Sequence, residues 1–314
     1  MLDRREFIEI AGVGLVAAGI LTNAGHAAEG VPVGICDWNL RDANNHGGTC
    51  RPDLIPRAKE AHLDGIQVSI GSSPDNIPLR SAEVRKQYVE LGKQHGIAFP
   101  SVAAGSICNS IPLKSEPQSA IYVLDALEGA KALGAKCTLI AFFGNGDLRL
   151  ADSTGKLRNI SKEQYKEYEL DSQGVSRVVE ALRQLVPRAE DLGVIIGLEN
   201  TLTAKQNLEI IERVGSPMVQ VYYDIANSFS NGYDVPGEIR MLGNERICEI
   251  HLKDNGKDVT YFEAPNADID WPAITQAVKD IGFDKWFVIE ESGRENRFME
   301  DTQASVAFAK KVLA

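Results

Sequence analysis

The feature that most constrains this chain is a series of four short apolar runs in its C-terminal third. Val, Ile, Leu, Phe and Tyr fill these runs almost continuously, as is typical of parallel strands covered on both faces. Each run ends in one side chain that can bind a metal: Glu199 in VIIGLENT, Asp224 in VQVYYDIANS, His251 in ICEIHLKDN and Glu290 in KWFVIEES. Helical patterns over residues 208–214, 235–242 and 271–281 separate the runs. The order along the chain is therefore strand, helix, strand, helix.

The same residue types at the ends of four successive strands predict a shared site. In a closed barrel of parallel strands, side chains at the carboxyl ends converge above the barrel mouth. Three carboxylates brought so close together would repel one another and would raise one another's pKa values, unless a cation lies between them. The pattern therefore predicts a divalent metal site.

The first half of the chain adds the same alternation. The predicted strands are residues 31–40, 65–70, 97–104 and 138–143, and the predicted helices are residues 52–63, 82–95, 118–133 and 174–192. The eight predicted strands, the seven helices between them and an eighth helix after the last strand, at a spacing of about 30–40 residues, are typical of an α/β fold, the (β/α)8 TIM barrel, as a single domain over residues 31–314. An open, doubly wound parallel sheet is the alternative.

The motifs L-E-N, Y-D-x-x-N, H-L-K-D and I-E-E, in this order, resemble those of the xylose isomerase-like TIM-barrel superfamily, the sugar phosphate isomerases and epimerases. The resemblance covers roughly residues 31–312. It implies that the metal ligands are Glu199, Asp224, His251 and Glu290, and that Glu199 and Glu290 are also catalytic. Asn227 stands where ketose 3-epimerases of this group tend to carry His, which argues against a simple 3-epimerase.

The chemistry follows from the ligand set. Carboxylates with one imidazole suit Mn²⁺, Mg²⁺ or Co²⁺, with Zn²⁺ also open. A metal-polarised carbonyl acidifies the neighbouring C–H bond, so that a carboxylate can remove the proton and form an enediolate. Returning the proton to the opposite face gives epimerisation, returning it to the next carbon gives isomerisation, and losing a β-substituent gives elimination. We predict a metal-dependent isomerase or epimerase of an unphosphorylated carbohydrate. The alternatives are a lyase or hydratase acting on a keto-sugar or 3-keto-glycoside, and a non-catalytic sugar-binding barrel.

Five residues in the loops after the strands are candidates for substrate binding. Trp38 could stack on a sugar ring, although a single Trp also serves in packing. His46, in the loop NNHGGTC, is either a polar substrate contact or a surface histidine. Asn227 follows the second ligand, and Arg294 lies in the loop after the last strand. Lys253 points to the same side of the chain as His251 and could bind a substrate hydroxyl or an oxyanion.

Two of these interpretations have alternatives in the local sequence. Lys253 could instead pair with Asp254 or Glu291. The long irregular stretch 144–161 is interpreted either as a lid over the substrate or as a solvated surface loop.

The N-terminus predicts export. Arg4 and Arg5 precede a Gly- and Ala-rich apolar segment, residues 10–21, and small residues around Ala27 suit a signal peptidase. The arginine pair resembles a twin-arginine signal, with residues 1–27 removed and the mature protein in the periplasm without a membrane span. A lipid-anchored or uncleaved form that stays tethered to the membrane is the alternative.

The overall charge limits the kinds of molecule that the protein is expected to bind. A formal net charge of −11 argues against binding to nucleic acid, because phosphate binding needs clustered Lys and Arg. A small, neutral carbohydrate is the more natural ligand. Of the five cysteines, Cys50 and Cys108 fall in loops, where an exported location would permit a disulfide.

Replacing both Arg4 and Arg5 with Lys should retain the protein in the cytoplasm, because the twin-arginine pathway recognises the guanidinium pair rather than positive charge alone. Cell fractionation with immunodetection measures this. Unchanged periplasmic delivery of the double variant would rule out the twin-arginine signal.

Overall fold

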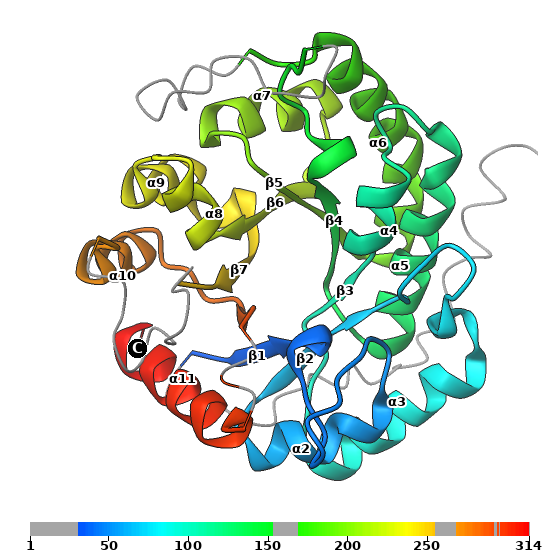
Figure 1. Cartoon of the computed structure of the whole chain (residues 1–314). Coiled ribbons are helices and arrows are strands. Elements are labelled where there is room, and N and C mark those ends of the chain that lie inside the picture. Colours follow the sequence, from blue (N-terminus) through cyan, green and yellow to red (C-terminus); the bar gives the residue numbers. More distant parts are fainter. Residues whose placement is uncertain (1–30, 153–168, 255–267, 292–293, 295, 314) are drawn as a thin grey trace, which may run out of the picture. The chain divides into compact units, whose positions relative to one another are not determined.

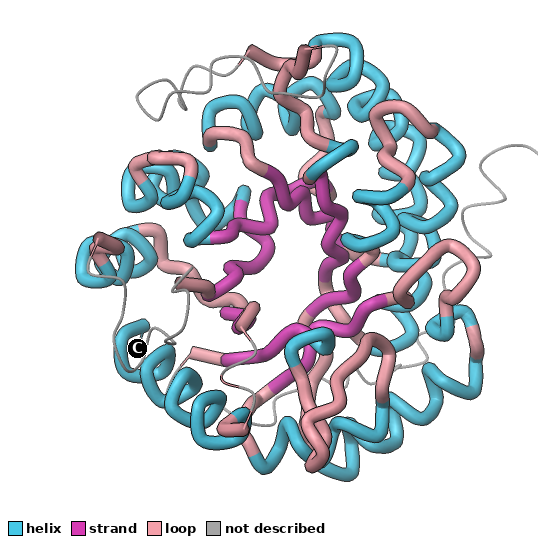
Figure 2. Tube along the Cα trace, viewed as in Figure 1, coloured by secondary structure: helices cyan, strands magenta, loops and turns pink. Residues whose placement is uncertain are grey.

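The structure, a computed structural model, describes residues 31–152, 169–254, 268–291, 294 and 296–313. Eight parallel strands close into a barrel in the order β1 to β8, and β8 pairs with β1 through Val33–Phe287, Gly34–Val288 and Ile35–Ile289. Figures 1 and 2 show the strands at the centre and the helices around them. The predicted TIM barrel is confirmed, and the doubly wound alternative is excluded. The predicted leader, residues 1–27, lies outside the described residues.

The elements follow the predicted alternation. The strands are β1 (Val33–Cys36), β2 (Gly65–Ser69), β3 (Ser101–Ala103), β4 (Cys137–Phe142), β5 (Ile195–Asn200), β6 (Val219–Asp224), β7 (Ile247–Leu252) and β8 (Phe287–Ile289). The α-helices are α2 (Ile55–Glu60), α3 (Ala82–His95), α4 (Gly105–Ser110), α5 (Ala120–Leu133), α6 (Ser172–Leu192), α7 (Ala204–Val214), α8 (Ile225–Ser230), α9 (Val235–Arg246), α10 (Trp271–Asp280) and α11 (Phe298–Leu313). Short 3-10 helices are η1 (Asp37–Asn39), η2 (Pro52–Leu54), η3 (Pro78–Arg80), η4 (Pro117–Ser119) and η5 (Gly144–Gly146).

Local sequence signals set the helix ends. Thr203 begins α7 with a capping box, in which its side chain accepts from the backbone of Gln206 and the Gln206 side chain accepts from the backbone of Thr203. This cap starts α7 four residues before the predicted helix. Gly193 ends α6 at φ 66°, a left-handed conformation that turns the chain toward β5 and that residues with a Cβ rarely adopt. The short helices α4 and α8, which follow β3 and β6, were not predicted, because six residues carry too little periodicity.

Two layers of side chains stabilise the barrel. The large apolar core lies between the strands and the surrounding helices. Inside the barrel lies a smaller cluster of Ala103, Cys137, Leu139, Ala141, Tyr222 and Cys248. Space there is tight, because a Cβ on Gly197 would lie 2.7 Å from the Cys248 sulfur. All five cysteines are buried free thiols, so Cys50 and Cys108 are not bonded to each other.

No helix in the described part of the chain is long and apolar enough to cross a bilayer. This finding covers residues 31–152, 169–254, 268–291 and 296–313 only.

Asp37 links the loop after β1 to the end of β2. Its carboxylate is buried and accepts hydrogen bonds from the backbone N–H groups of Cys50 and Ser69, both at 2.8 Å, and from the Ser69 hydroxyl at 2.7 Å. Burial raises the pKa of Asp37 from 3.8 to about 6, and these hydrogen bonds oppose the rise. These hydrogen bonds fix the backbone at Asp37, next to Trp38. Burying the charged carboxylate costs desolvation free energy.

This burial predicts a measurable dependence of stability on pH. Because the folded-state pKa of Asp37 lies above the unfolded value, its contribution to stability is fully present below about pH 4 and is lost as the pH rises through 6. Asp37→Asn keeps the shape, and its amide can accept from both backbone N–H groups while it donates to Ser69. We expect Asp37→Asn to be more stable than the wild type at pH 7.5, by up to about 3 kcal/mol, and the difference to shrink toward pH 4. Urea unfolding at several pH values measures it, and an equal pH dependence in the two proteins would contradict the assignment.

Candidate active site

The four predicted ligands meet at the carboxyl ends of neighbouring strands. Glu199 lies in β5, Asp224 is the last residue of β6, His251 lies in β7 and Glu290 directly follows β8. One potential ligand atom from each lies within 4.8 Å of all the others. The His251 Nδ1 is 3.2 Å from Glu199 Oε1, 3.5 Å from Glu290 Oε2 and 4.0 Å from Asp224 Oδ2. The predicted convergence of these four side chains therefore occurs in the structure.

Backbone contacts hold the acids in place. Asp224 also caps α8, because its Oδ1 accepts from the backbone N–H of Asn227 at 2.7 Å. This cap leaves Oδ2 facing His251. The backbone N–H of Glu290 donates to the Leu252 carbonyl at 2.9 Å, so the pairing of β8 with β7 continues to the ligand itself. Glu199, Asp224 and His251 are buried, and the Glu290 side chain is 20% exposed.

The site gathers positive charge around its carboxylates. Burial disfavours charge on His251, but Glu199, Glu290 and Asp224 outweigh this effect and raise its pKa to about 9. Burial also disfavours charge on Lys253, yet Asp224 and Glu290 raise its pKa well above the usual value. The Lys253 ammonium lies 2.9 Å from Glu290 Oε2 and 3.4 Å from Asp224 Oδ2. It pairs with these two acids rather than with Asp254 or Glu291, and Glu291 instead accepts from the backbone N–H of Asp254 at 2.7 Å.

These residues fit a divalent cation. Three carboxylates and one imidazole form a hard, oxygen-rich donor set, and their ligand atoms already surround one space. Without a metal, the positive charges of His251 and Lys253 offset only part of the negative charge of the three carboxylates. A bound divalent ion would take the place of the proton on His251 Nδ1, since a ligating imidazole must be neutral at that nitrogen.

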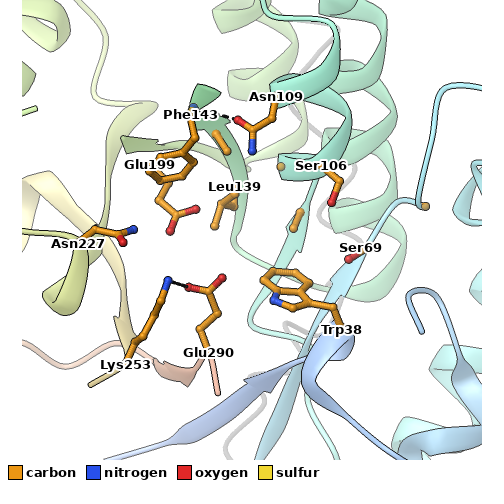
Figure 3. A pocket seen from close by; sticks show the side chains of 14 residues that line it. Trp38, Ser69, Ser106, Asn109, Leu139, Phe143, Glu199, Asn227, Lys253 and Glu290 are labelled. Carbon is orange, nitrogen blue, oxygen red and sulfur yellow. Dashed lines mark hydrogen bonds and ion pairs between the residues drawn. The ribbon is translucent and has the colours of Figure 1, made fainter. Parts of the chain in front are cut away.

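A pocket of about 400 Å³ opens beside the ligands (Figure 3). Glu199 and Glu290 line it, whereas Asp224 and His251 do not. Figure 3 shows the two glutamate carboxylates facing the same space, with the Trp38 ring beside them. The two predicted catalytic glutamates are therefore the two ligands that a bound substrate could reach.

The five predicted substrate contacts divide into two groups. Trp38, Asn227 and Lys253 line the pocket. His46 does not, because its side chain is 74% exposed and lies 3.6 Å from Asp42. Arg294 does not line the pocket either, because its backbone and guanidinium groups donate to the buried Asp301 of α11 at 2.7–2.9 Å. The structure therefore does not bring His46 and Arg294 to the pocket wall, and each has an acidic partner close by in the sequence.

The pocket wall also contains residues that the sequence did not single out: Ser69, Ser106, Asn109 and Phe143. Asn109 Oδ1 accepts from the backbone N–H of Phe143 at 2.9 Å. This bond fixes the orientation of the amide, and Figure 3 shows its nitrogen on the pocket side. Ser106 and Asn109 belong to the short helix α4, and no periodic signal in the sequence marked that helix.

Hydrogen bonds of Arg149 connect the described start of the loop after β4, residues 144–152, to the end of α8. The guanidinium of the buried Arg149 binds the Asp147 carboxylate at 2.7–3.2 Å and donates to Asn231, after α8, at 2.9 Å. The first half of the predicted lid, residues 144–152, is described, and its second half, residues 153–161, lies outside the described part of the chain.

Comparison with known proteins points to one family. A family model described as "Xylose isomerase-like TIM barrel" matches residues 55–312. A 2-epi-5-epi-valiolone 7-phosphate 2-epimerase of Actinoplanes sp. is 24% identical over 227 residues, which cover 72% of this chain and 73% of the relative.

Solved structures share the fold. The 3-keto-D-glucoside 4-epimerase YcjR of E. coli matches with a TM-score of 0.68 at 13% identity, over 90% of this chain and 99% of that protein. The D-psicose 3-epimerase of Clostridium cellulolyticum H10, solved with D-tagatose, matches with a TM-score of 0.64 at 18% identity, also over 90% and 99%. At these identities the structural matches establish the barrel and leave the reaction to be argued from the site.

His251→Ala should lower the bound divalent metal sharply, by tenfold or more in affinity, because it removes the nitrogen ligand from the centre of the acid cluster. Elemental analysis after metal loading and gel filtration measures the content. His46→Ala is the matched control, since His46 is exposed and does not line the pocket. Equal metal content in all three proteins would show that His251 is not a ligand.

Proposed function

The chain belongs to the xylose isomerase-like TIM barrel family, and we propose that it is a divalent-metal-dependent isomerase or epimerase of an unphosphorylated carbohydrate. The observation that carries this proposal is the placement of two carboxylates, Glu199 and Glu290, in one pocket beside a complete metal-ligand set. Proton removal and return beside a carbonyl require such a pair. A binding protein without catalysis would not need it.

Glu199 and Glu290 would act as the base and the acid of the proposed proton transfer. A bound divalent ion, with Mn²⁺, Mg²⁺ or Co²⁺ favoured by the oxygen-rich donors and Zn²⁺ open, would polarise the substrate carbonyl. One glutamate removes the proton from the neighbouring carbon to give the enediolate, and the other delivers a proton to the opposite face or to the next carbon. The Lys253 ammonium, 2.9 Å from Glu290 Oε2, holds that carboxylate in position and supplies positive charge beside the developing oxyanion.

The chemistry of the pocket wall supports a neutral sugar. Among the described residues that line the pocket, Lys253 is the one cation, and its ammonium is bound to Glu290 and Asp224. A phosphate group favours several basic or N–H donors arranged to receive it. The remaining polar groups on the wall are the hydroxyls and amides of Ser69, Ser106, Asn109 and Asn227, which suit sugar hydroxyls. The Actinoplanes relative is named for a phosphorylated substrate, so the two proteins would differ in this respect.

The N-terminal sequence supports the same substrate class. The twin-arginine pattern at Arg4 and Arg5 is the basis for proposing a periplasmic location, and sugar phosphates are cytoplasmic metabolites. An exported enzyme would therefore meet free sugars or glycosides.

Elimination from a keto-sugar or a 3-keto-glycoside is the second candidate. The same two glutamates could remove a proton and protonate a departing β-substituent. The observation that favours it is Asn227, a neutral amide that lines the pocket where ketose 3-epimerases of this group tend to carry a histidine. NMR in D₂O separates the two candidates. Isomerisation or epimerisation gives a deuterated isomer of the substrate, whereas elimination gives an unsaturated product that has lost the β-substituent.

Two substitutions can separate the role of the acids in proton transfer from their role in binding the metal. Glu290→Gln keeps a ligating oxygen and nearly the same volume, but it cannot accept a proton. We expect it to retain much of its metal while turnover falls about 10²–10⁴-fold. Asp224→Asn should act through metal affinity, because Asp224 does not line the pocket, and excess metal should restore much of its activity.

Assays at saturating metal, with deuterium incorporation in D₂O as a second readout, test both expectations. The wild type should incorporate deuterium and Glu290→Gln should incorporate very little. Full activity of Glu290→Gln, together with carbohydrate turnover without any C–H exchange, would contradict the enediolate reaction.

A further inference from the structure

Below the four ligands, the barrel interior holds a connected series of buried polar side chains. Gln67 of β2, Ser101 of β3, Tyr222 of β6 and Glu249 of β7 are each at most 2% exposed. None of them lines the pocket, and none is among the four ligands. Such a series is expensive to bury unless every donor and acceptor is satisfied, so the direction of each hydrogen bond can be worked out.

The directions start at Glu249, because donors occupy both of its carboxyl oxygens, with the Cys137 thiol 3.1 Å from Oε1 and two hydroxyls at Oε2. Its Oε2 accepts from the Ser101 hydroxyl at 2.7 Å and from the Tyr222 hydroxyl at 2.6 Å. Both hydroxyl protons are therefore committed to Glu249. Toward Gln67, each hydroxyl oxygen can offer only a lone pair.

The Gln67 amide is oriented by these two lone pairs. Its Nε2, which only donates, lies 2.9 Å from Ser101 Oγ and 2.8 Å from Tyr222 OH. The reversed amide would set an oxygen against two oxygens that have no proton left to donate, so it is excluded. Gln67 Oε1 must then face the other way, where it lies 3.1 Å from His251 Nε2 and accepts from the Cys36 thiol at 3.2 Å.

An accepting oxygen at this position decides which His251 nitrogen carries the proton. His251 Nε2 must donate to Gln67. When the imidazole becomes neutral to bind a metal, Nδ1 is therefore the nitrogen that gives up its proton and offers a lone pair to the space among Glu199, Asp224 and Glu290. The Tyr222 ring packs edge-on against the imidazole, with centroids 4.5 Å apart, and holds its plane.

We propose that Gln67 is a positioning residue that holds His251 in its metal-binding tautomer, and that Ser101, Tyr222 and Glu249 fix the Gln67 amide in the accepting direction. This proposal rests on the metal site of the proposed function and adds a set of residues that touch neither metal nor substrate. Partners that orient a ligating histidine commonly contribute 10–100-fold to metal affinity.

The first test is Gln67→Met, which keeps the length of the side chain but offers no strong acceptor. We expect its Kd for Zn²⁺, measured by chelator competition, to be about 10–100-fold higher than that of the wild type. Thr138→Val is the matched control, because it removes another buried hydrogen bond of the barrel, from Thr138 to the Ile195 carbonyl at 3.2 Å, without touching this series. The control should bind Zn²⁺ like the wild type, and thermal unfolding of the metal-free proteins should show comparable losses of stability in the two variants.

The second test separates the accepting oxygen from the shape of the side chain. Gln67→Glu keeps an oxygen toward His251 Nε2, and in its protonated form it also keeps a donor toward Ser101 and Tyr222. Its Zn²⁺ affinity should lie within a few-fold of the wild type. Affinity as low as that of Gln67→Met would show that the accepting oxygen is not the cause.

The third test addresses the more distant part of the series. In the double variant Ser101→Ala, Tyr222→Phe, the ring that packs on His251 is kept, but both acceptors for the Gln67 amide nitrogen are lost. The amide is then free to turn its NH₂ group toward His251, so Zn²⁺ affinity should fall several-fold or more. Wild-type affinity in this double variant would overturn the proposed orientation of Gln67.

NMR spectroscopy can observe the proton on His251 Nε2 directly. In the Zn²⁺-loaded wild type labelled with ¹⁵N-histidine, the His251 Nε2–H signal, assigned by its absence from His251→Ala, should be observable at neutral pH because its hydrogen bond slows exchange. In Zn²⁺-saturated Gln67→Met it should be broadened or lost, and an unchanged signal would overturn the proposal. These readouts need no turnover, so they stand even if the proposed isomerase activity is wrong, whereas a wild type that binds no Zn²⁺ would refute the metal site itself.

Discussion

Repulsion among three carboxylates is the interaction on which the rest of the active site depends. Glu199, Asp224 and Glu290 each bring an oxygen to within 4.8 Å of the others, and largely away from water. Burial raises the pKa of Asp224, and His251 and Lys253 oppose the rise with their positive charge. The fold thus keeps an electrostatically unfavourable arrangement that two protons only partly relieve. A divalent cation relieves it more completely, so the folded protein is preorganised for that ion.

The barrel divides the work between its two halves. β5 to β8 carry the four charged ligands, whereas the first half supplies most of the pocket wall: Trp38 after β1, Ser69 of β2, Ser106 and Asn109 of α4, and Leu139, Ala141 and Phe143 in or after β4. Because the barrel is closed by the pairing of β8 with β1, the neutral wall and the charged wall face one cavity. In the proposed enzyme, changes in the neutral wall would therefore alter which carbohydrate is bound without disturbing the four candidate ligands.

Much of this arrangement could be predicted from the sequence, and the exceptions have physical reasons. The four ligands were identifiable because each ends an apolar strand, and parallel strands in a barrel must bring their ends together. The role of Gln67 could not be predicted from the sequence. A single polar residue in the strand GIQVS becomes informative only when the closed barrel places Tyr222 and His251 across from it. His46 and Arg294 were placed in the site because basic residues in loops after the strands are common substrate contacts. Asp42 and Asp301, four and seven residues away, bind them instead, and this local pairing was a signal available in the sequence.

The four candidate ligands fall into two pairs according to whether they line the pocket. Glu199 and Glu290 reach the pocket, whereas Asp224 is held by the N-terminus of α8 and His251 by Gln67 in the barrel interior. Under the proposed function, epimerisation, isomerisation and elimination would all begin with proton removal by Glu199 or Glu290, so the candidate ligand set suits each reaction equally. What differs among them is where the second proton is delivered and which substituent lies beside it. In the proposed enzyme, that choice would belong to the groups that orient the substrate. Among the described residues that line the pocket, Asn109, Asn227 and Trp38 present an amide with a fixed orientation, a second amide and an aromatic ring for this purpose.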